Sequence, residues 1–540
     1  MYNNFLWWRD GVIYQIYVRS FADSNGDGIG DLKGIIDHLD YLNGMTDSLG
    51  IDAIWLTPIN PSPGYDFGYD VSDYENIDPV FGSMNDFELL IKEAHKRNIR
   101  VIMDFVFNHT SHLHPWFIES SRSKDNPKRN WYLWGDAKPN GDPPNNWQAC
   151  FGGNAWQWDD TTKQFYYHMF LKEQPDLNWR NEEVRKEIFR IIKKWLELGV
   201  DGLRLDVVNG FFKDELLRDN PPANGERPFD QQLHIYDRDR PELIPVITEL
   251  RSLLDSFPER MAVGEVIGEN PNITAKYFGD GSQLLNLAFN FDLIKQHWDA
   301  KKMLCSILNW ESALHTKAFP CYFLSNHDFH RHATRFGAGV NSDAKSKVAA
   351  AMLLTLRGTP FLYYGEELGM QDTVIPKEEI QDPFGKNYTQ LGRDPERNPM
   401  QWNDSANAGF TTAVPWLRAN DDYKIRNVIL QQKDENSVLN FYKKLIKLRK
   451  ESVTLQKGRL VIINHSSDDV LIYLRQYEDE AFLIGLNFSD KQQYIEYDNP
   501  AKSKCWRKML SSISDGHFTQ GNKIILEPFE AYIGQAELDD

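Results

Sequence analysis

The stretch DGLRLDVVNG, residues 201–210, places an arginine and an aspartate two positions apart inside an otherwise apolar run. Successive side chains of a strand point to opposite faces, so Arg204 and Asp206 share one face while the leucines beside them share the other. Two charges in a buried strand are costly unless they are paired, and the structural interpretation is an internal salt bridge. The chemical interpretation is a carboxylate that the guanidinium keeps ionised, as a nucleophile requires.

Three further stretches present a carboxylate at the end of an apolar run. They are DFVFNH with Asp104, VGEV with Glu265 and SNHD with Asp328. Any one of these acids could cap a helix or lie on the surface. Like charges brought to one place are destabilising, however, so four acids at corresponding positions indicate a site that uses them.

The apolar runs themselves predict eight strands, at residues 12–18, 53–58, 100–106, 202–208, 261–266, 285–290, 321–326 and 358–367. Segments between them, such as 85–98 and 181–199, carry apolar residues at helical spacing. This alternation predicts an α/β protein built of parallel βα units, and eight units predict a closed (β/α)8 TIM barrel. The C-terminal strand ends of such a barrel form one mouth, where the four acids are expected to meet.

Two long insertions and a change of pattern divide the chain further. Residues 107–175 are rich in Trp, Asn, Gly and Pro and are too long for an ordinary loop, so they predict an inserted domain over the mouth. A second insertion covers about 370–430, and after a predicted helix at 437–453 alternating strands predict a small antiparallel β domain. The predicted organisation is a barrel of residues 1–106 and 176–455, an insertion of 107–175 and a C-terminal β domain of 456–540.

The composition favours a small uncharged ligand. The 540 residues include 16 Trp, 23 Tyr and 31 Phe, which suit sugar faces but also pack in any large core. The net charge of -18 repels phosphate backbones and anionic lipid, so no nucleic acid and no membrane partner is expected. The 4 cysteines lack C-x-x-C spacing, which argues against a disulfide framework or a zinc site. With no basic N-terminal region and no long apolar run, a cytoplasmic monomer or homodimer is expected.

In combination, the motifs DFVFNH, QPDLNW, GLRLDVV, GEV and SNHD resemble the ordered motifs of the α-amylase family of glycoside hydrolases and transglycosylases, over almost the whole chain. The resemblance implies that the first insertion is the domain B of that family and the C-terminal strands its domain C. It implies that Asp206 is the nucleophile, Glu265 the general acid/base and Asp328 the third carboxylate. Around the same sugar it implies Arg204, His109 and His327.

A physical argument accompanies these roles. A retaining glycosidase needs an ionised carboxylate to attack the anomeric carbon and a protonated acid on the leaving oxygen, about 5–5.5 Å apart. Arg204 is expected to lower the pKa of Asp206. The sequence neighbours of Glu265 are apolar and include no cation, so its pKa is expected to be raised and Glu265 to donate the proton.

Two more stretches are similar to motifs of the exo-acting α-glucosidases in this family. PSPGYDFGYDVSDY resembles their D-x-G-Y-D arrangement, which implies that Asp66 binds hydroxyls of the terminal sugar and Tyr69 stacks on it; the alternative is a polar turn with a buried tyrosine. GRDPERNPMQW is similar to their R-x-P-x-x-W signature, which implies that Arg397 reaches the same glucose. Phe170 and Gln174 are expected to line the pocket too.

The loop DSNGDGIGD, residues 23–31, alternates oxygen ligands with glycines as a calcium loop does. In the family branch that the chain resembles, this loop carries calcium or magnesium, so a structural Ca²⁺, or Mg²⁺ in its place, is expected. The implied ligands are Asp23, Asn25, Asp27, Asp31 and the carbonyl of Ile29. A hydrated Asx-rich turn is the alternative.

The resemblance implies a retaining exo-α-glucosidase that acts on small neutral α-glucosides through a glycosyl-enzyme intermediate. A glucosyl transferase or isomerase of the trehalose synthase or sucrose isomerase type remains open. A non-catalytic binding protein like the heavy chains of amino-acid transporters is disfavoured, because the three implied catalytic acids are all present.

The linkage is expected to depend on Val207, the residue after the implied nucleophile. In the exo-glucosidases that the chain resembles, valine here goes with α-1,6 linkages and alanine or threonine with α-1,4. The alternative is that Val207 is a good β-former that fills the strand. The segment 211–222 resembles branches that prefer α-1,4 substrates, so an α-1,4-specific enzyme stays open beside a slight preference for isomaltose-type substrates.

Overall fold

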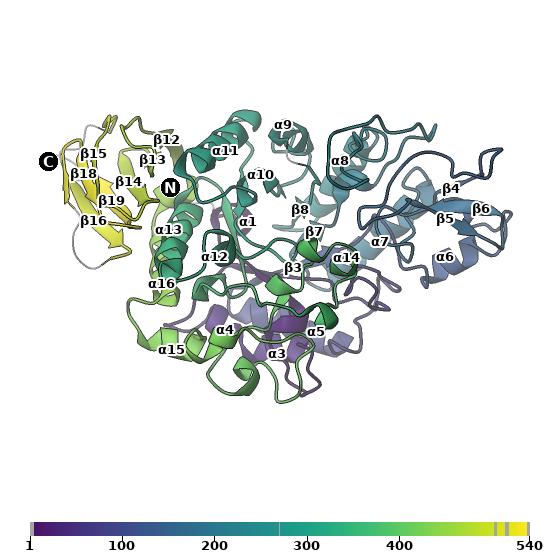
Figure 1. Cartoon of the computed structure of the whole chain (residues 1–540), viewed down its shortest axis with the longest axis horizontal. Helices are drawn as coiled ribbons and strands as arrows, with labels where there is room; N and C mark the ends of the chain where they lie inside the picture. The colour runs from purple at the N-terminus through teal and green to yellow at the C-terminus, as the bar shows by residue number, and fades with distance from the viewer. Residues whose placement is uncertain (1–4, 269, 502–504, 514–517, 537–540) are drawn as a thin grey trace.

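A computed structural model of the chain describes residues 5–268, 270–501, 505–513 and 518–536. At its centre lies an eight-stranded parallel sheet with the strand order β10-β11-β1-β2-β3-β7-β8-β9. Figure 1 labels β3, β7 and β8 of this sheet near the middle of the molecule. The strands are β1 (Ile13–Ile16), β2 (Ala53–Leu56), β3 (Arg100–Phe105), β7 (Gly202–Leu205), β8 (Met261–Gly264), β9 (Leu287–Ala288), β10 (Cys321–Phe323) and β11 (Thr359–Tyr363). All eight predicted strands are present, each shorter than its apolar run. They form a nearly closed barrel, so the predicted TIM-barrel fold is confirmed.

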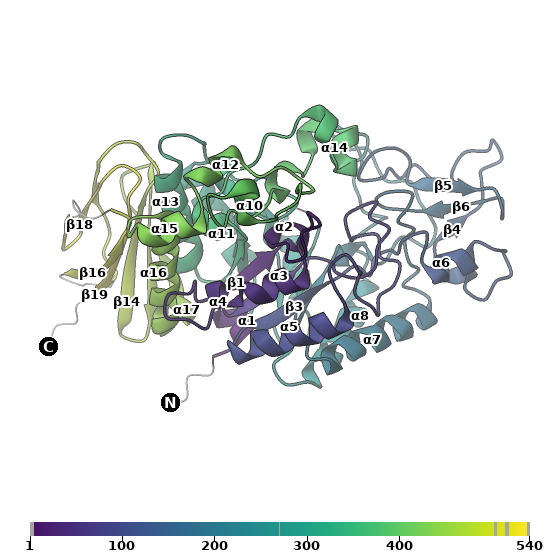
Figure 2. The same ribbon diagram turned by 90° about the horizontal axis from the view of Figure 1, so that it is seen from below.

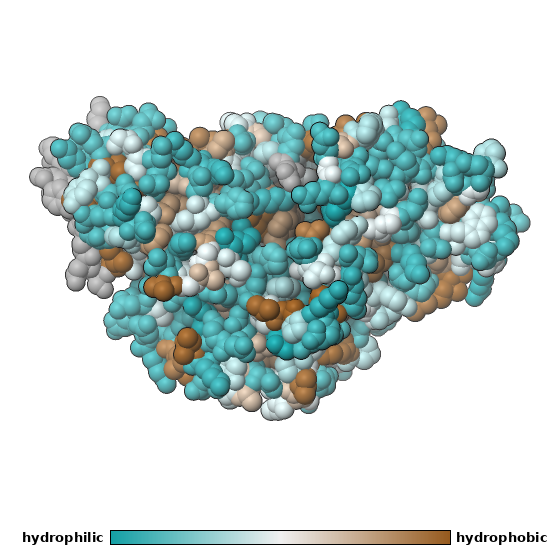
Figure 3. All heavy atoms as spheres, in the orientation of Figure 1, coloured by the Kyte–Doolittle hydropathy of each residue, from teal (hydrophilic) through white to brown (hydrophobic). Residues whose placement is uncertain are grey.

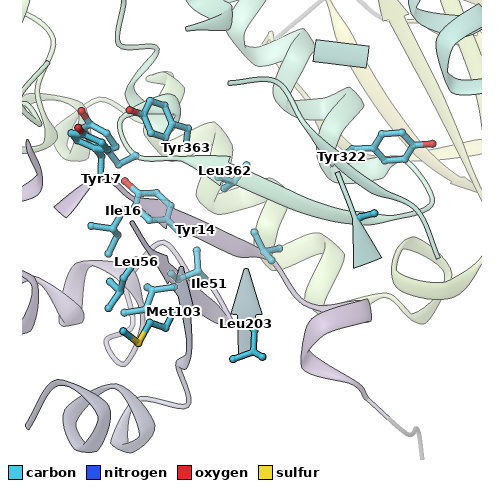
Figure 4. Packing of buried hydrophobic residues seen from close by; sticks show 14 of the residues in the cluster. Tyr14, Ile16, Tyr17, Ile51, Leu56, Met103, Leu203, Tyr322, Leu362 and Tyr363 are labelled. Carbon is cyan, nitrogen blue, oxygen red and sulfur yellow. The ribbon is translucent and has the colours of Figure 1, made fainter. Parts of the chain in front are cut away.

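The barrel strands are apolar on both faces because each face contacts a different part of the core. One set of alternate residues, including Ile13, Trp55 and Ile102, forms a cluster with aromatic rings of β9–β11 and the loops after them. The other set packs against the surrounding helices, and Figure 4 shows Ile16 and Leu56 among its members. Near the C-terminal ends of the strands, the residues of the first set are polar. Polar side chains therefore face the mouth of the barrel.

Helices surround the barrel between successive strands (Figures 1 and 2). The longest are α5 (Met84–Lys96), α7 (Glu182–Glu197), α8 (Leu243–Asp255), α11 (Ala300–Ala313), α13 (Ser342–Thr355) and α16 (Val438–Glu451). Four of them begin at the polar residues expected of helix N-termini: Ser83 and Asp86 form a capping box at α5, and Asn181, Asp299 and Ser437 cap α7, α11 and α16. None of the described helices is long and apolar enough to cross a lipid bilayer.

The chain between β3 and β7 contains a three-stranded antiparallel sheet of β4 (Trp134–Gly135), β6 (Gln164–Tyr167) and β5 (Trp156–Asp159). At the other end of the long axis, a five-stranded sheet has the order β12-β13-β14-β19-β16 and a three-stranded sheet the order β15-β18-β17 (Figure 1). Their strands are β12 (Arg459–Ile462), β13 (Val470–Tyr477), β14 (Glu480–Asn487), β15 (Gln493–Glu496), β16 (Trp506–Ser511), β17 (Phe518–Gln520), β18 (Lys523–Leu526) and β19 (Ala531–Ala536). The predicted antiparallel C-terminal sheet is therefore present.

Candidate active site

One buried arginine holds three of the strand-end carboxylates together. Arg204 lies in β7 and is 1% exposed. Its Nη1 donates to Oδ1 of Asp206 at 2.6 Å and to Oδ1 of Asp104 at 2.8 Å. Its Nη2 lies 2.7 Å from Oε2 of Glu265. Because β3, β7 and β8 are neighbours in the sheet, their C-terminal ends bring these acids to one mouth.

The pKa values of the two central acids are both raised. Burial raises the pKa of Glu265 to about 8 and that of Asp206 to about 7, and in both acids the charge of Arg204 acts in the opposite direction. Burial disfavours the charged form of an acid, so the acid with the higher pKa keeps its proton to higher pH. Burial therefore favours the protonated form of both acids, whereas Arg204 favours the ionised form of both.

One prediction about the surroundings of Glu265 is wrong, whereas Arg204 does lower the pKa of Asp206 as predicted, although burial has the larger effect. Glu265 does have an adjacent cation, because β7 and β8 are paired side by side and Arg204 reaches across to it. The pKa of Asp206 is not below its ordinary value, because the loss of hydration outweighs the attraction of the guanidinium. The pKa of Glu265 is raised, as the role of proton donor requires.

A cavity of about 220 Å³ opens directly above these carboxylates. This volume is below the roughly 300–1,000 Å³ of pockets that hold drug-sized ligands, which suits a ligand about the size of one sugar. Eight of the predicted site residues line the cavity: Asp66, Tyr69, His109, Phe170, Asp206, Val207, Glu265 and Asp328. Five lining residues were not predicted: Phe151, Ile267, Phe329, Phe384 and Arg393.

The other predicted residues lie behind the lining and orient it. Gln174 donates from Nε2 to Oδ2 of Asp66 at 3.1 Å. His327 lies parallel to the ring of Tyr69, with 5.4 Å between ring centroids, and its Nε2 is 2.5 Å from the hydroxyl oxygen of Tyr69. Arg397 is fully buried and donates from Nε to the carbonyl of His327 at 2.7 Å. These side chains, like Arg204, fix the positions of residues that face the cavity.

Asp328 is the acid with the most cationic surroundings. Burial alone would raise its pKa, but His327, Arg393 and Arg397 around it hold the pKa below its ordinary value. Arg397 contributes a hydrogen bond from Nη2 to Oδ1 of Asp328 at 3.0 Å. Asp328 is therefore ionised wherever Asp206 is, which is consistent with an acid that binds sugar hydroxyls rather than one that donates a proton.

Arg393 is the functional candidate that the sequence motif did not indicate. Its Nη2 donates to Oδ1 of Asp66 at 2.8 Å and to Oδ1 of Asp382 at 2.7 Å, and its Nη1 donates to Oδ1 of Asp328 at 3.1 Å. Arg393 lines the cavity, whereas Arg397, which the motif match favoured, lies behind it. The available signal was its place in GRDPERNPMQW, four residues before Arg397.

Val207 does not belong to the strand. β7 ends at Leu205, and Val207 has φ +42° and ψ +45°, in the left-handed region that a β-branched residue rarely adopts. Its backbone N–H donates to Oε2 of Glu265 at 3.2 Å, and its side chain lines the cavity. The interpretation of Val207 as a strand-filling residue is therefore wrong, and such local strain is commonly found at functional sites.

The outer rim of the cavity is built where the two insertions meet. Phe151 of the first insertion stacks on Phe384 of α14 (Pro383–Asn387), with centroids 4.9 Å apart and an interplanar angle of 20°. Asn387 donates from Nδ2 to the carbonyl of Phe151 at 3.0 Å. Phe170 contacts Phe151 edge to face at 5.5 Å. The predicted placement of the first insertion over the barrel mouth thus has a physical basis in aromatic packing.

The loop 23–31 has regular Asx turns in its first half. Oδ1 of Asp23 accepts the N–H of Asn25 at 3.0 Å, Oδ1 of Asn25 accepts that of Asp27 at 2.9 Å, and Oδ1 of Asp27 accepts that of Ile29 at 2.8 Å. These turns place oxygen donors close together along the loop. Asp23, Asn25, Asp27 and the carbonyl of Ile29 fit a hard cation in this respect.

Asp31 fits the predicted ion less well. Its Oδ1 caps α3 (Leu32–Asp37) by accepting the N–H of Gly34 at 2.6 Å, and its Oδ2 accepts from Ser24. Among the described residues, the three aspartates of the loop do not bring carboxylate oxygens within 4.8 Å of one another as a set. Calcium at this loop stays a prediction, and Asp31 would have to leave its capping position to join the ligands.

If calcium binds this loop, chelation is expected to lower the melting temperature more than the initial rate. The loop lies outside the cavity lining and is joined to the second insertion by a hydrogen bond from Thr411 to Asp23. Thermal unfolding and initial rates with and without EGTA test this, with Asp27→Ala as the variant that should lose any calcium-dependent stabilisation. Immediate loss of activity in folded protein, restored by calcium, would contradict a structural role.

Two family models cover most of the chain. The model of the α-amylase catalytic domain matches residues 15–458, and the model of the maltogenic amylase C-terminal domain matches residues 460–533. The chain belongs to the α-amylase family. The resemblance inferred from the ordered motifs is therefore confirmed, and the barrel with its strand-end acids is the catalytic domain of a glycoside hydrolase of this family.

Named relatives of this α-amylase family member resemble it along nearly its whole length. A probable α-glucosidase of Rhizobium meliloti is 41% identical and covers 90% of each chain. An oligo-1,6-glucosidase of Heyndrickxia coagulans is 39% identical and covers 98% of this chain and 99% of its own. A solved structure described as an α-glucosyl transfer enzyme, XgtA, is 38% identical, has a TM-score of 0.93 and covers 99% of this chain and 100% of its own.

Proposed function

We propose that this protein is a retaining exo-α-glucosidase that releases glucose from the non-reducing end of short α-glucosides. The proposal rests on the ion pairs of Arg393 with Asp66 and Asp328 in the cavity lining, which we take to close the inner end of the cavity. A terminal sugar can reach Asp206 and Glu265 only if nothing extends beyond this ion-pair network. An oligosaccharide labelled at its reducing end should therefore lose one glucose at a time, and release of internal fragments would contradict the proposal.

The proposed reaction uses one of the two central acids in its ionised form and the other in its protonated form. Ionised Asp206 attacks the anomeric carbon while Glu265 gives its proton to the leaving oxygen, which forms a covalent glycosyl-enzyme intermediate. Glu265, now ionised, then removes a proton from the water that attacks the intermediate. Two inversions at the anomeric carbon give net retention of the α configuration.

The charged groups around the sugar have separate proposed roles. Asp66, Arg393 and Asp328 bind hydroxyl groups of the terminal glucose, and their mutual ion pairs hold them in place before substrate arrives. Tyr69 provides an aromatic face whose orientation is fixed by the parallel ring of His327. His109, whose Nε2 lies 2.9 Å from the carbonyl oxygen of Tyr69, completes this wall.

A glucosyl transferase or isomerase is the second candidate. The intermediate of a retaining mechanism can be captured by a sugar instead of water, and the aromatic rim formed by Phe151 and Phe384 offers a surface for such an acceptor. Product analysis on maltose, isomaltose, sucrose and trehalose, measured side by side, separates the candidates. Glucose as the main early product supports hydrolysis, and isomerised or longer sugars support transfer.

We also propose a cytoplasmic location and small neutral substrates. The thiols of Cys150, Cys305 and Cys321 are free, as is usual in a reducing compartment. On the face shown in Figure 3, hydrophobic side chains are scattered rather than gathered into one patch. The expectation of a monomer or a homodimer stays a prediction.

Val207→Thr is expected to raise activity on maltose relative to isomaltose. The side chain lines the cavity beside Glu265, where the sugar on the leaving side must pass, and the change replaces a methyl group by a hydroxyl. Discrimination by one such group is typically worth about 1–3 kcal/mol, so the ratio should change by roughly tenfold or more. Threonine is also β-branched, so the backbone strain at φ +42° is retained. An unchanged ratio of the two kcat/KM values would remove the reason for preferring α-1,6 linkages.

A further inference from the structure

A second group of potential ligands lies beside the active site but outside the cavity. His330 follows β10 two residues after Asp328, Asp372 lies in the segment after β11, and Glu396 is in the 3-10 helix η7 (Pro395–Arg397). Among the described residues, this is the one set of three or more His, Cys, Asp or Glu side chains whose ligand atoms all lie within 4.8 Å of one another. Three segments that are distant in sequence thus converge on one point.

Hydrogen bonds within this group cannot provide a partner for every one of its polar atoms. Nδ1 of His330 is 2.9 Å from Oδ2 of Asp372 and 3.2 Å from Oε2 of Glu396. An imidazole nitrogen carries at most one proton, so it cannot donate fully to both carboxylates. Glu396 is 1% exposed, and within the described structure its Oε2 has no hydrogen-bond donor in acceptable geometry. A buried carboxylate oxygen in this position calls for another positive partner.

The same distances suit a metal ion. Zinc binds histidine nitrogen and carboxylate oxygen at about 2.0–2.2 Å, so two of its ligand atoms lie roughly 2.9–3.5 Å apart for bond angles between 90° and tetrahedral. Both distances from His330 fall in this range. Imidazole favours zinc and related transition metals over calcium and magnesium.

The surroundings of the group orient one carboxylate and leave the histidine accessible. The other oxygen of Asp372 accepts the backbone N–H of Arg331 at 2.9 Å, which orients Oδ2 toward His330. Arg331 donates to the carbonyl of Tyr364 at 2.6 Å and Arg397 donates to Asp328 at 3.0 Å. Within the described structure, Nη2 of Arg331 and Nη1 of Arg397 have no hydrogen-bond acceptor. The side chain of His330 is 42% exposed, which leaves room for entry and for water ligands.

We propose that His330, Asp372 and Glu396 bind one divalent transition-metal ion such as Zn²⁺. None of the three lines the cavity, so the ion does not contact the sugar. The ion links the loop that carries Asp328 to the segments that carry Arg397 and Arg393. Its role is to fix the positions of these residues relative to one another. Cysteine spacing excludes a cysteine-based zinc site and has no bearing on a site made of one histidine and two carboxylates.

The test uses the full-length protein freed of metal by chelation and dialysis, with Co²⁺ as a spectroscopic substitute for zinc. One Co²⁺ per chain is expected, with a visible ligand-field band and a melting temperature that rises with added Co²⁺ or Zn²⁺. His330→Gln is expected to weaken binding at least about 100-fold, because it removes a direct ligand. The matched control is His315→Gln, which alters an exposed histidine elsewhere and should leave the band unchanged.

Asp27→Ala separates this site from the predicted calcium loop and should leave Co²⁺ binding intact. Because His330 lies near the surface, His330→Gln is expected to fold, and circular dichroism checks this before titration. Absence of a stoichiometric Co²⁺ band in the unaltered protein would overturn the proposal, and so would equal binding by His330→Gln. Neither result would bear on glucose release, which depends on Asp206 and Glu265.

Discussion

Asp206→Ala and Glu265→Gln are each expected to abolish turnover of natural disaccharides while leaving the protein folded. Asp206 forms the bond to the sugar and Glu265 protonates the leaving oxygen, so neither step has another group to perform it. Loss of a general acid alone typically costs about 10²–10⁴-fold in rate. Initial rates on isomaltose and maltose, with circular dichroism of each variant, measure the effect.

A substrate with a good leaving group distinguishes the two roles. The first step on 4-nitrophenyl α-glucoside needs little help from an acid, so Glu265→Gln should retain a burst of nitrophenol, whereas Asp206→Ala should show none. A burst in Asp206→Ala and none in Glu265→Gln would mean that Glu265 is the nucleophile and Asp206 the general acid. Asp206→Asn, which keeps the size of the side chain, controls for loss of packing around Arg204.

The pH dependence follows from the same pair. Activity is lost as the pH falls and Asp206 is protonated, and it is lost as the pH rises and Glu265 is ionised, so kcat/KM should be bell-shaped. Burial raises both pKa values, which places the whole profile above the ordinary carboxylate range. In Glu265→Gln, the rate of the nitrophenol burst should no longer decrease at alkaline pH, because the group whose ionisation causes the decrease is absent.

Arg393→Ala is expected to produce the second largest effect, on both stability and activity. The substitution leaves Asp66, Asp328 and Asp382 without the guanidinium that contacts all three. Breaking a buried ion pair by removing one partner costs about 3–5 kcal/mol, and here three contacts share one partner. A lower melting temperature and a strongly reduced kcat/KM on isomaltose are expected.

Arg393→Lys separates charge from geometry. Lysine keeps the positive charge but cannot present two nitrogens to several carboxylates at once, so stability should recover more than activity does. Arg418→Ala is the matched control, because Arg418 pairs with Glu379 on the surface and exposed pairs are worth about 0–1 kcal/mol. If Arg393→Ala were as mild as Arg418→Ala, the closed end of the cavity would not depend on Arg393.

The barrel was predictable because its signal is local. Each strand is a short apolar run, and each acid of the mouth lies near the C-terminal end of such a run, so the fold and the acids could be predicted together. Helices α5 and α7 were predictable for the same reason, since their apolar residues recur at helical spacing. The aromatic rim was less accessible, because Phe151 and Phe384 come from separate insertions and meet only in three dimensions.

The errors concern contacts across strands and insertions. Glu265 has no cation beside it in sequence, yet Arg204 reaches it from the adjacent strand. Arg393 and Arg397 lie in one short stretch, and the motif alone could not tell which faces the cavity. Val207 follows a strand-like run, but its left-handed backbone conformation depends on the turn that leads out of the barrel. Pairing register, side-chain reach and local backbone strain decide these points, and none of them is encoded by composition or periodicity.

The anomeric configuration of the first product tests the central claim most directly. If Asp206 attacks the anomeric carbon and water later replaces it, glucose leaves with the α configuration of the substrate. Proton NMR of isomaltose hydrolysis, recorded before mutarotation proceeds, separates the anomeric signals of α- and β-glucose. We expect α-glucose to appear first and β-glucose to increase only as the sugar mutarotates. Early β-glucose would contradict it, because direct attack by water would then leave Asp206 without a role as nucleophile.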